Sequence, residues 1–341
     1  LRALGEDARR RRWAETTFCV LRAGGYRLED LLARRVAELG EKTLFLDRGA
    51  TPPVAWSYHR VLRRARGFAA AFLEAARGRP RVALLVGNSV DGALSDLACL
   101  AHDILVTPLS THFGHEELAW ILSRLDINVV VSDSEDRLRR LVQVRERRGL
   151  DFTLFSLHPG RTVERGEARL LEEAVTALLP REMDRLLAER ARLDPHEPCT
   201  VMFTSGSTGR PKGVVFTPYH LLSKRFARAA ALPEVGEDER FLCYLPLFHT
   251  FGRYLEMMGS IFWRGTYVFA GNPSAETLLA LLPEVRPTAL ISIPLRWVQL
   301  RDHLQRAVDR AESEKERRAV FDHLTGGRPV SYTHLRAHET V

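Results

Sequence analysis

The stretch that decides the fold reads Thr204, Ser205, Gly206, Ser207, Thr208, Gly209, Arg210, Pro211, Lys212, Gly213. It lies between two apolar runs, residues 199–203 and 214–216, so we expect a loop that joins two strands. Glycines let several backbone amides point into one concavity, the hydroxyls add donors, and Lys212 supplies positive charge. Pro211 stiffens the approach to the lysine because it fixes its own φ and restricts Arg210 before it. These are the components of a cradle for a polyphosphate.

Two other phosphate-binding patterns do not fit this loop. A P-loop needs a glycine directly before its lysine and a serine or threonine after it, whereas Pro211 and Gly213 occupy those places. The dinucleotide fingerprint GxGxxG fails because no glycine lies two residues before Gly206. The remaining alternative is a flexible surface linker, which the apolar flanks and the single proline and lysine disfavour.

The sequence on both sides of the loop predicts an α/β fold with mainly parallel sheets. Helical faces are formed by Leu28, Leu31, Leu32 and Val36, and by Val61, Leu62, Ala65, Phe68, Ala69 and Phe72. Strand-like runs lie at residues 82–86, 104–106, 128–131, 152–155, 199–203, 214–216, 241–245, 267–269 and 289–293. Ser57 and Asn88 are suited to cap the helices that follow them. Helices and strands that alternate in this way are typical of α/β proteins.

We divide the chain into four parts. Residues 160–198 are charged and mostly helical, and Pro195 and Pro198 should end this segment. We therefore expect an N-terminal extension (residues 1–25), a first α/β subdomain (26–196) and a second α/β subdomain with the phosphate loop (197–329). Residues 330–341 fit no periodic element, and we interpret them as a foreign or misread tail.

Composition excludes several classes of protein. The 341 residues are 45% hydrophobic and 27% charged, which is close to globular averages and rules out wholesale disorder. The net charge of +7 comes mostly from arginine, since Lys42, Lys212, Lys224 and Lys315 are the only lysines. Basic residues are interleaved with acidic ones, so we expect no nucleic-acid partner.

Cysteine spacing and hydropathy indicate a cytoplasmic location. Cys19, Cys99, Cys199 and Cys243 lie far apart without zinc-ligand spacing, so we interpret them as reduced thiols. No stretch reaches the roughly 18 apolar residues that span a bilayer, and the first residues lack the apolar stretch of a signal peptide. The sequence leaves open a peripheral contact with a membrane.

The loop resembles the Ser/Thr/Gly-rich signature, ending in Pro-Lys-Gly, of the adenylate-forming (AMP-binding) superfamily. That superfamily includes acyl-CoA ligases, luciferases and peptide-synthetase adenylation domains. The resemblance extends from about Tyr26 to about Gly327, and several further groups of residues recur in similar order: Trp56, Ser57 and Tyr58; Pro108 and Leu109; and Tyr244, Leu245, Pro246, Leu247, Phe248 and His249. It implies the large N-terminal domain of such an enzyme, with two α/β subdomains.

The resemblance also implies a two-step reaction. A carboxylate attacks the α-phosphate of ATP to give an acyl-adenylate and pyrophosphate, and coenzyme A then displaces AMP. ATP, Mg²⁺ and coenzyme A would be the cofactors. The implied ATP-binding residues are Thr204, Ser205, Gly206, Ser207, Thr208, Gly209 and Lys212, with Thr204 nearest to the magnesium. Their donors and charge would neutralise the departing phosphates.

A second segment, which follows residue 248, is implied to line the acyl pocket. It contains His249, Phe251, Gly252 and Arg253, and its pattern resembles the enzymes for long-chain fatty acids more than those for acetate or amino acids. The alternative is that His249 is a satisfied buried histidine and that Phe248 and Phe251 belong to the ordinary core.

Three landmarks of the superfamily do not occur in this sequence. They are an aromatic-Gly-x-Thr-Glu run, a Thr-Gly-Asp run, and a mobile C-terminal lid domain that carries a catalytic lysine. We therefore expect an N-terminal fragment of a fatty acyl-CoA ligase, which acts on fatty acid, ATP and coenzyme A but is inactive as this chain alone. The alternative is a non-catalytic module that binds a nucleotide or an acyl group.

Overall fold

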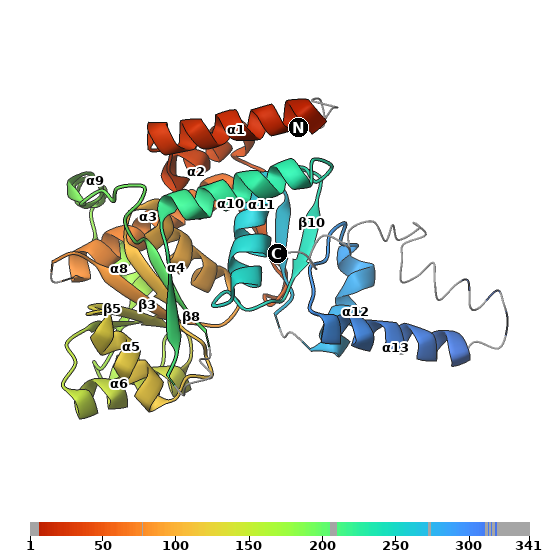
Figure 1. Ribbon diagram of the computed structural model, residues 1–341. Coiled ribbons are helices and arrows are strands. Elements are labelled where there is room, and N and C mark those ends of the chain that lie inside the picture. Colours follow the sequence, from red (N-terminus) through yellow and green to blue (C-terminus); the bar gives the residue numbers. More distant parts are fainter. Residues whose placement is uncertain are drawn as a thin grey trace.

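The computed structural model describes residues 7–76, 78–204, 210–271 and 274–310, together with residues 313, 315 and 318. Figure 1 shows a large sheet with helices on both faces, beside a smaller sheet that contains β10. Helices α12 and α13 lie beyond the smaller sheet. The predicted α/β class with mainly parallel sheets is confirmed.

The large sheet has seven strands in the order β7-β6-β5-β3-β4-β8-β9. They are β3 (Arg81–Leu85), β4 (Leu105–Pro108), β5 (Val129–Ser132), β6 (Thr153–Ser156), β7 (Arg169–Leu170), β8 (Thr200–Thr204) and β9 (Lys212–Phe216). Neighbouring strands are parallel except β8 and β9, which are antiparallel. The near-continuous apolar sequences of β3 and β5 suit strands that are covered on both faces.

Helices pack on both faces of this sheet. Side chains of α3 (Tyr58–Ala75) and α4 (Val90–Ala101) share one core with Val82 and Leu84 of β3. Side chains of α5 (His115–Arg124) and α6 (Glu135–Arg148) share a second core with Ala83 and Leu85. Successive side chains of a strand point to opposite faces, so β3 contributes to both cores in alternation.

The smaller sheet has the order β10-β11-β1-β2. Its strands are β1 (Thr43–Asp47), β2 (Val54–Ser57), β10 (Arg240–Cys243) and β11 (Thr266–Phe269). β11 lies between β1 and β10 and is parallel to both, whereas β2 is antiparallel to β1. The ring of Phe45 meets Tyr267 and Phe269 edge-on, with centroids 5.8 and 5.5 Å away. Leu278 of α12 (Ala275–Val285) packs against this sheet in a third hydrophobic core, which is separate from the two described above.

The remaining helices surround the two sheets. They are α1 (Asp7–Gly24), α2 (Leu28–Leu39), α7 (Arg161–Glu164), α8 (Leu171–Ala177), α9 (Pro180–Glu189), α10 (Pro218–Ala231), the π-helix η2 (Phe251–Met257), α11 (Met258–Trp263) and α13 (Pro294–Arg310). Helix α1 lies along α10 (Figure 1), where the rings of Trp13 and Phe226 are 6.1 Å apart.

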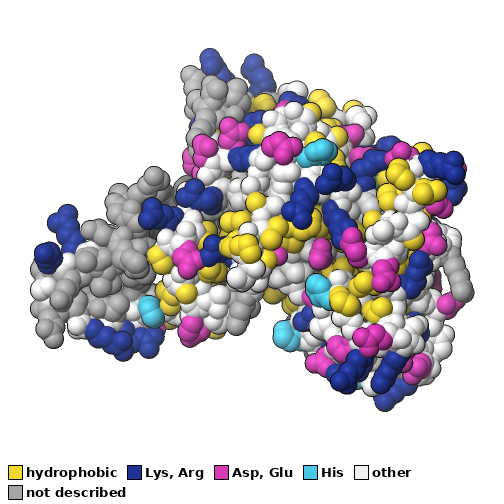
Figure 2. Space-filling view, turned by 180° about the vertical axis from the view of Figure 1, so that it is seen from behind, with side chains coloured by type: hydrophobic (Ala, Val, Ile, Leu, Met, Phe, Trp, Pro, Cys, Tyr) yellow, Lys and Arg dark blue, Asp and Glu magenta, His cyan; other side chains and the backbone are white. Residues whose placement is uncertain are grey.

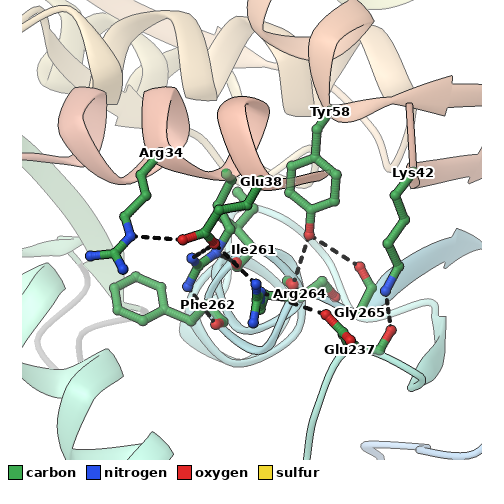
Figure 3. A network of polar contacts seen from close by, with 11 residues as sticks. Arg34, Glu38, Lys42, Tyr58, Glu237, Ile261, Phe262, Arg264 and Gly265 are labelled. Atoms are coloured by element: carbon green, nitrogen blue, oxygen red, sulfur yellow. Dashed lines mark hydrogen bonds and ion pairs between the residues drawn. The ribbon is translucent and has the colours of Figure 1, made fainter. Parts of the chain in front are cut away.

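A polar network ties the early helices to the end of α11 (Figure 3). Arg35 donates to the carbonyl oxygens of Ile261 and Phe262 at 3.0 and 3.1 Å. Arg264, which has a left-handed φ of 69°, donates to Glu38 at 3.1 Å. Helix C-terminal carbonyls lack partners within their own helix, and the guanidinium of Arg35 satisfies two of them. The network therefore fixes α2 against the segment that leads into β11.

Most of the strand-like runs in the sequence form strands, but residues 289–293 do not. Of that run only Ala289 pairs, in a single parallel bridge to Phe241. Sequence analysis also did not find β1, β2 and β7. The predicted cap at Ser57 is confirmed, since its side chain accepts a hydrogen bond from the amide of Arg60 at 3.2 Å.

The expected division at residues 196/197 differs from the arrangement of the sheets. Strands β8 and β9 follow that point but extend the sheet of β3 to β7, and β1 and β2 precede it but complete the sheet of β10 and β11. Strand pairing, and not position along the chain, therefore groups the elements. The expected tail at residues 330–341 lies outside the described residues.

Candidate functional site

The candidate site lies at the edge of the large sheet where its parallel strands have their carboxyl ends. After β3 the chain crosses to β4 on one side, and after β4 it crosses back to β5 on the other side of β3. The connections that leave β3 and β5 therefore run in opposite directions, and the crevice outside the carboxyl ends of two such neighbouring strands is where open α/β sheets bind ligands. β8 lies next to β4 and ends at Thr204, so the phosphate loop begins at this edge.

Thr204 and Lys212 form the base of the phosphate loop. They are paired across the β8–β9 ladder, and the hydroxyl of Thr204 lies 3.5 Å from the carbonyl oxygen of Lys212. Both residues are exposed, and no described residue forms a hydrogen bond or ion pair with the ammonium of Lys212. The loop residues Ser205, Gly206, Ser207, Thr208 and Gly209 lie outside the described residues. The two flanking strands predicted for this segment are confirmed as β8 and β9, which also include Thr204, Lys212 and Gly213.

A glycine is needed at the start of β9. A Cβ atom at Gly213 would lie 3.1 Å from Val201 and 3.2 Å from the ring of Phe203, closer than most real contacts. Gly213 therefore allows β9 to pair closely with β8 directly after Lys212, and this pairing holds the lysine at the mouth of the loop.

The side chain of Asn88 joins this edge to the segment that follows β10. Its Nδ2 donates to the carbonyl oxygen of Leu245 at 2.7 Å, and its Oδ1 accepts from the amide of Leu247 at 2.9 Å. The predicted helix cap at Asn88 is wrong, since Ser89 caps α4 by accepting from the amide of Gly92. Asn88 instead holds the loop that contains Phe248 and His249 beside the end of β3.

His249 and Phe251 lie near the surface of this segment. His249 is exposed and the side chain of Phe251 is 39% exposed, so neither is a buried core residue, in contrast to the alternative interpretation. Phe248 is half-buried, and its ring centroid is 6.5 Å from that of His112, which follows β4. Side chains from the ends of β4 and β10 thus meet at the same edge.

Gly252 and Arg253 lie deeper, at the start of η2. A Cβ atom at Gly252 would lie 2.3 Å from the carbonyl oxygen of Leu245 and 2.5 Å from that of Pro246, so no side chain fits there. Arg253 has no exposed surface. Its Nε and Nη2 bind both carboxylate oxygens of Asp96 on α4, and its Nη1 donates to the Thr200 hydroxyl at 2.7 Å.

The charge of Arg253 is stable in this environment. Burial opposes the charged form, but Asp96 and Tyr254 outweigh it, and the pKa of Arg253 lies above its ordinary value. The guanidinium therefore links η2 to α4 and β8 as a permanent cation.

A buried carboxyl group that sequence analysis did not single out lies one helical turn beyond Arg253. Glu256 has no exposed surface, and burial raises its pKa well above the ordinary value, although the amide of Leu245 partly opposes this rise. Burial therefore favours the neutral, protonated form of Glu256. No local pattern distinguishes it from a surface glutamate, because its burial depends on the packing of η2 against β10.

The described residues contain no group of three or more His, Cys, Asp or Glu side chains that could hold a metal ion. Magnesium at this edge would need substrate oxygens, which is its usual mode of binding with phosphates. The long contact of the Thr204 hydroxyl leaves that oxygen able to contribute, so the residues present fit a magnesium ion that substrate phosphates hold.

The surface of the protein carries charged side chains of both signs. Figure 2 shows basic and acidic side chains interspersed over the face it presents. In the part of the chain that the structure describes, no helix has the length and apolar character needed to cross a membrane. All four cysteines are free thiols.

A mainly parallel α/β sheet, in which a Ser/Thr/Gly-rich run of the sequence separates β8 from β9, matches the N-terminal domain of the adenylate-forming enzymes. The chain belongs to the AMP-binding enzyme family, whose sequence model matches residues 32–341.

Curated relatives and solved structures agree with this family. The chain is 22% identical over 271 residues to a long-chain-fatty-acid–CoA ligase of Xenopus laevis, covering 77% of this chain and 36% of that protein. It is 24% identical to fatty acyl-CoA synthetase A of Dictyostelium discoideum, covering 78% and 40% of the two chains. Its fold matches ATP-bound MatB of Rhodopseudomonas palustris with a TM-score of 0.65 at 20% identity, covering 87% and 54%. The chain thus spans less than half the length of these two curated relatives.

Proposed function

We propose that the protein activates a carboxylic acid with ATP, forms an acyl-adenylate, and transfers the acyl group to coenzyme A. The observation that carries this proposal is the position of Thr204 and Lys212, which are paired at the base of the phosphate loop, at the edge of the sheet where its parallel strands have their carboxyl ends. Family membership supports the chemistry. A long-chain fatty acid is the proposed substrate, because the Xenopus relative is named a long-chain-fatty-acid–CoA ligase and the Dictyostelium relative a fatty acyl-CoA synthetase.

In the first step, the substrate carboxylate forms a bond to the α-phosphorus as the bond to the β-phosphate oxygen breaks and pyrophosphate leaves. Lys212 would hold the β,γ-phosphates by charge-assisted hydrogen bonds, and the loop hydroxyls and amides of residues 205–209 would add donors. The Thr204 hydroxyl would contribute to a magnesium ion, which neutralises phosphate charge when bound. In the second step, the sulfur of coenzyme A attacks the acyl carbon and AMP leaves.

We assign the acyl pocket to the segment that Asn88 holds at this edge. The exposed side chains of His249 and Phe251 are available to line the pocket. Gly252 and Arg253 would support the pocket indirectly. Gly252 lets the chain pass close to Leu245, and Arg253 fixes η2 against Asp96. The apolar body of a fatty acid would contribute about 0.8 kcal/mol for each buried methylene.

Titration calorimetry with ATP and AMP tests the phosphate role. Lys212→Ala should weaken ATP binding by about tenfold to a hundredfold, since a hydrogen bond to a charged group contributes roughly 1.5 to 3 kcal/mol. AMP lacks the β,γ-phosphates, so the variant and the wild-type protein should bind AMP with equal affinity. Lys224→Ala is the matched control, because Lys224 is an exposed lysine on α10. Equal losses for ATP and AMP would rule out the assignment of Lys212.

Turnover is a separate question from binding. We expect the 341-residue chain by itself to release little pyrophosphate with ATP, Mg²⁺ and a long-chain fatty acid, because the sequence offers no counterpart of the superfamily's catalytic lysine. A pyrophosphate-release assay with acids of graded length addresses both the rate and the substrate. Rapid turnover would show that other groups of this chain supply the missing charge.

A further inference from the structure

The loop between β4 and α5 reaches the acyl segment, which we define as residues 245–253, from the large sheet. His112 of this loop lies against Phe248, with their ring centroids 6.5 Å apart and the rings edge-on at 86°. Phe248 follows β10 of the smaller sheet, so this contact joins the two sheets at the same edge as Asn88 does. The acyl segment is therefore held at two points, by Asn88 after β3 and by His112 after β4.

The loop itself is a tight turn that is anchored at its base. The amide of Leu109 donates to the carbonyl oxygen of Leu84 on β3 at 2.8 Å. The amide of Phe113 donates to the carbonyl oxygen of Ser110 at 3.1 Å, and the amide of His112 donates to the Ser110 hydroxyl at 3.3 Å. The side chain of His112 is exposed. The position of His112 therefore depends on this turn and not on burial of its ring.

Arg140 on α6 holds the turn from outside. Its Nη1 donates to the carbonyl oxygen of Phe113 at 2.8 Å and, more weakly, to that of Thr111 at 3.4 Å. These two carbonyl groups lie on either side of His112 in the chain. Arg140 forms no ion pair with any residue that the structure describes, whereas the two arginines before it on α6 pair with aspartates. The hydrogen bonds of its guanidinium to described residues therefore all go to the turn.

A guanidinium group suits this position because it presents several donors in a rigid plane. Hydrogen bonds from a charged donor are also stronger than those between neutral groups. An apolar side chain in place of Arg140 would leave the carbonyl oxygens of Thr111 and Phe113 without this donor and would let the turn relax. His112 would then lose its fixed position against Phe248.

We propose that His112 and Phe248 together form one wall of the acyl pocket, and that Arg140 is the positioning residue that holds this wall in place. The inference rests on the proposed function, because it requires that the acyl segment takes up a fatty acid. Edge-on aromatic rings offer an apolar surface against which an acyl chain packs. Arg140 touches no ligand in this arrangement and acts only through His112.

Binding of dodecanoate to the full 341-residue chain, measured by titration calorimetry, tests this proposal. His112→Ala should lower the affinity about twofold to tenfold, which corresponds to the usual contribution of an aromatic contact. Arg140→Met should lower it by a similar factor, and Arg140→Lys, which keeps a charged donor, should recover part of the loss. ATP affinity should stay unchanged in all three variants, because none of them alters the phosphate loop.

The double variant His112→Ala with Arg140→Met separates positioning from a general structural role. If Arg140 acts through His112, its loss adds nothing once the imidazole ring is gone, so the double variant should bind dodecanoate as weakly as His112→Ala alone. An arginine that only stabilises the fold would add its own loss to that of the histidine.

Gln143→Ala is the matched control. Gln143 lies one helical turn after Arg140 on α6, and its Oε1 is 2.8 Å from Nε2 of His115 at the start of α5. It thus makes a comparable contact from the same helix without touching the turn around His112. Gln143→Ala should leave dodecanoate affinity unchanged.

Two results would overturn the proposal. They are unchanged dodecanoate affinity in His112→Ala, and a double variant that binds clearly more weakly than His112→Ala alone. Should Arg140→Met fail to fold, Arg140→Lys replaces it in the double variant, with the same expected result. A wild-type chain that binds ATP but no dodecanoate would refute the acyl assignment of the proposed function, and this inference with it.

Discussion

The guanidinium of Arg253 and the carboxylate of Asp96 form a two-point ion pair inside the protein, with Nε and Oδ2 2.6 Å apart and almost no exposed surface on either side chain. The two residues are 157 positions apart in the chain. They join η2, whose first residues belong to the proposed acyl segment, to α4, which begins two residues after Asn88. The same guanidinium also donates to Thr200 and to the Tyr254 hydroxyl.

Breaking this pair from one side should be far more harmful than removing it. Asp96→Asn or Arg253→Met alone should lower the free energy of unfolding by about 3 to 5 kcal/mol, because each leaves a buried polar group without its partner. The double variant Asp96→Leu with Arg253→Met should recover much of that loss. Urea unfolding measures both effects. Arg185→Met is the control, since Arg185 and Glu189 form an exposed pair at 2.9 Å, which should contribute less than about 1 kcal/mol.

Asn88→Ala should impair ligand binding as well as stability. The variant removes two hydrogen bonds to the segment before His249, so we expect a loss of about 1 to 3 kcal/mol in stability and weaker binding of a fatty acid. Asn128 provides a matched control, because it bridges Arg79 and Arg81 in the same way at the opposite edge of the sheet. Asn128→Ala should destabilise by a similar amount without affecting fatty acid affinity. Equal effects of both variants on affinity would refute a positioning role for Asn88.

Gly252→Ala should destabilise the fold and is therefore unsuited to probing acyl chain length. Its methyl group would overlap the carbonyl oxygens of Leu245 and Pro246, and overpacking of this kind costs about 1 to 3 kcal/mol or more. Gly24→Ala should change stability little, since no atom lies within 4 Å of its added methyl group. Thermal unfolding compares the two. Phe251, which is partly exposed, is the better position for changing the preferred chain length.

Glu256→Gln should stabilise the protein in a pH-dependent way. The folded-state pKa of Glu256 is raised, so the folded state binds more protons than the unfolded state above the ordinary pKa of 4.5. Wild-type stability should therefore fall as pH rises from 4.5 toward the folded-state pKa, and glutamine removes that loss. The difference between variant and wild type should be larger at pH 8 than at pH 5 in urea unfolding. Glu146→Gln, at an exposed position on α6, should show no such trend.

Local patterns in the sequence predicted the features that depend on near neighbours. The Ser57 cap, the strands on both sides of the phosphate loop and the mainly parallel α/β class follow from turn chemistry, spacing and hydropathy. The family resemblance correctly indicated the superfamily because the Thr204–Gly213 run is specific.

Features that depend on distant partners were not predictable in the same way. Asparagine is a good helix cap, so Asn88 looked like one, whereas its amide binds the backbone 157 and 159 positions later. Arg253 was assigned to the acyl pocket because its segment resembles the one that lines that pocket in the family, and only the fold brings Asp96 to it. β1 and β2 were missed because β1 pairs with β11 far along the chain.

The pairing of β1 with β11 also orders events during synthesis. The hydroxyl of Thr266 bonds to the carbonyl oxygen of Thr43, 223 positions earlier in the chain. At about 5–20 residues per second, a ribosome needs roughly 10 to 45 s to make the intervening segment. During that time β1 can pair only with β2, and an isolated two-stranded hairpin is marginal in water. Nascent chains stalled before residue 266 would therefore expose the apolar surface around Phe45, the natural contact for a chaperone.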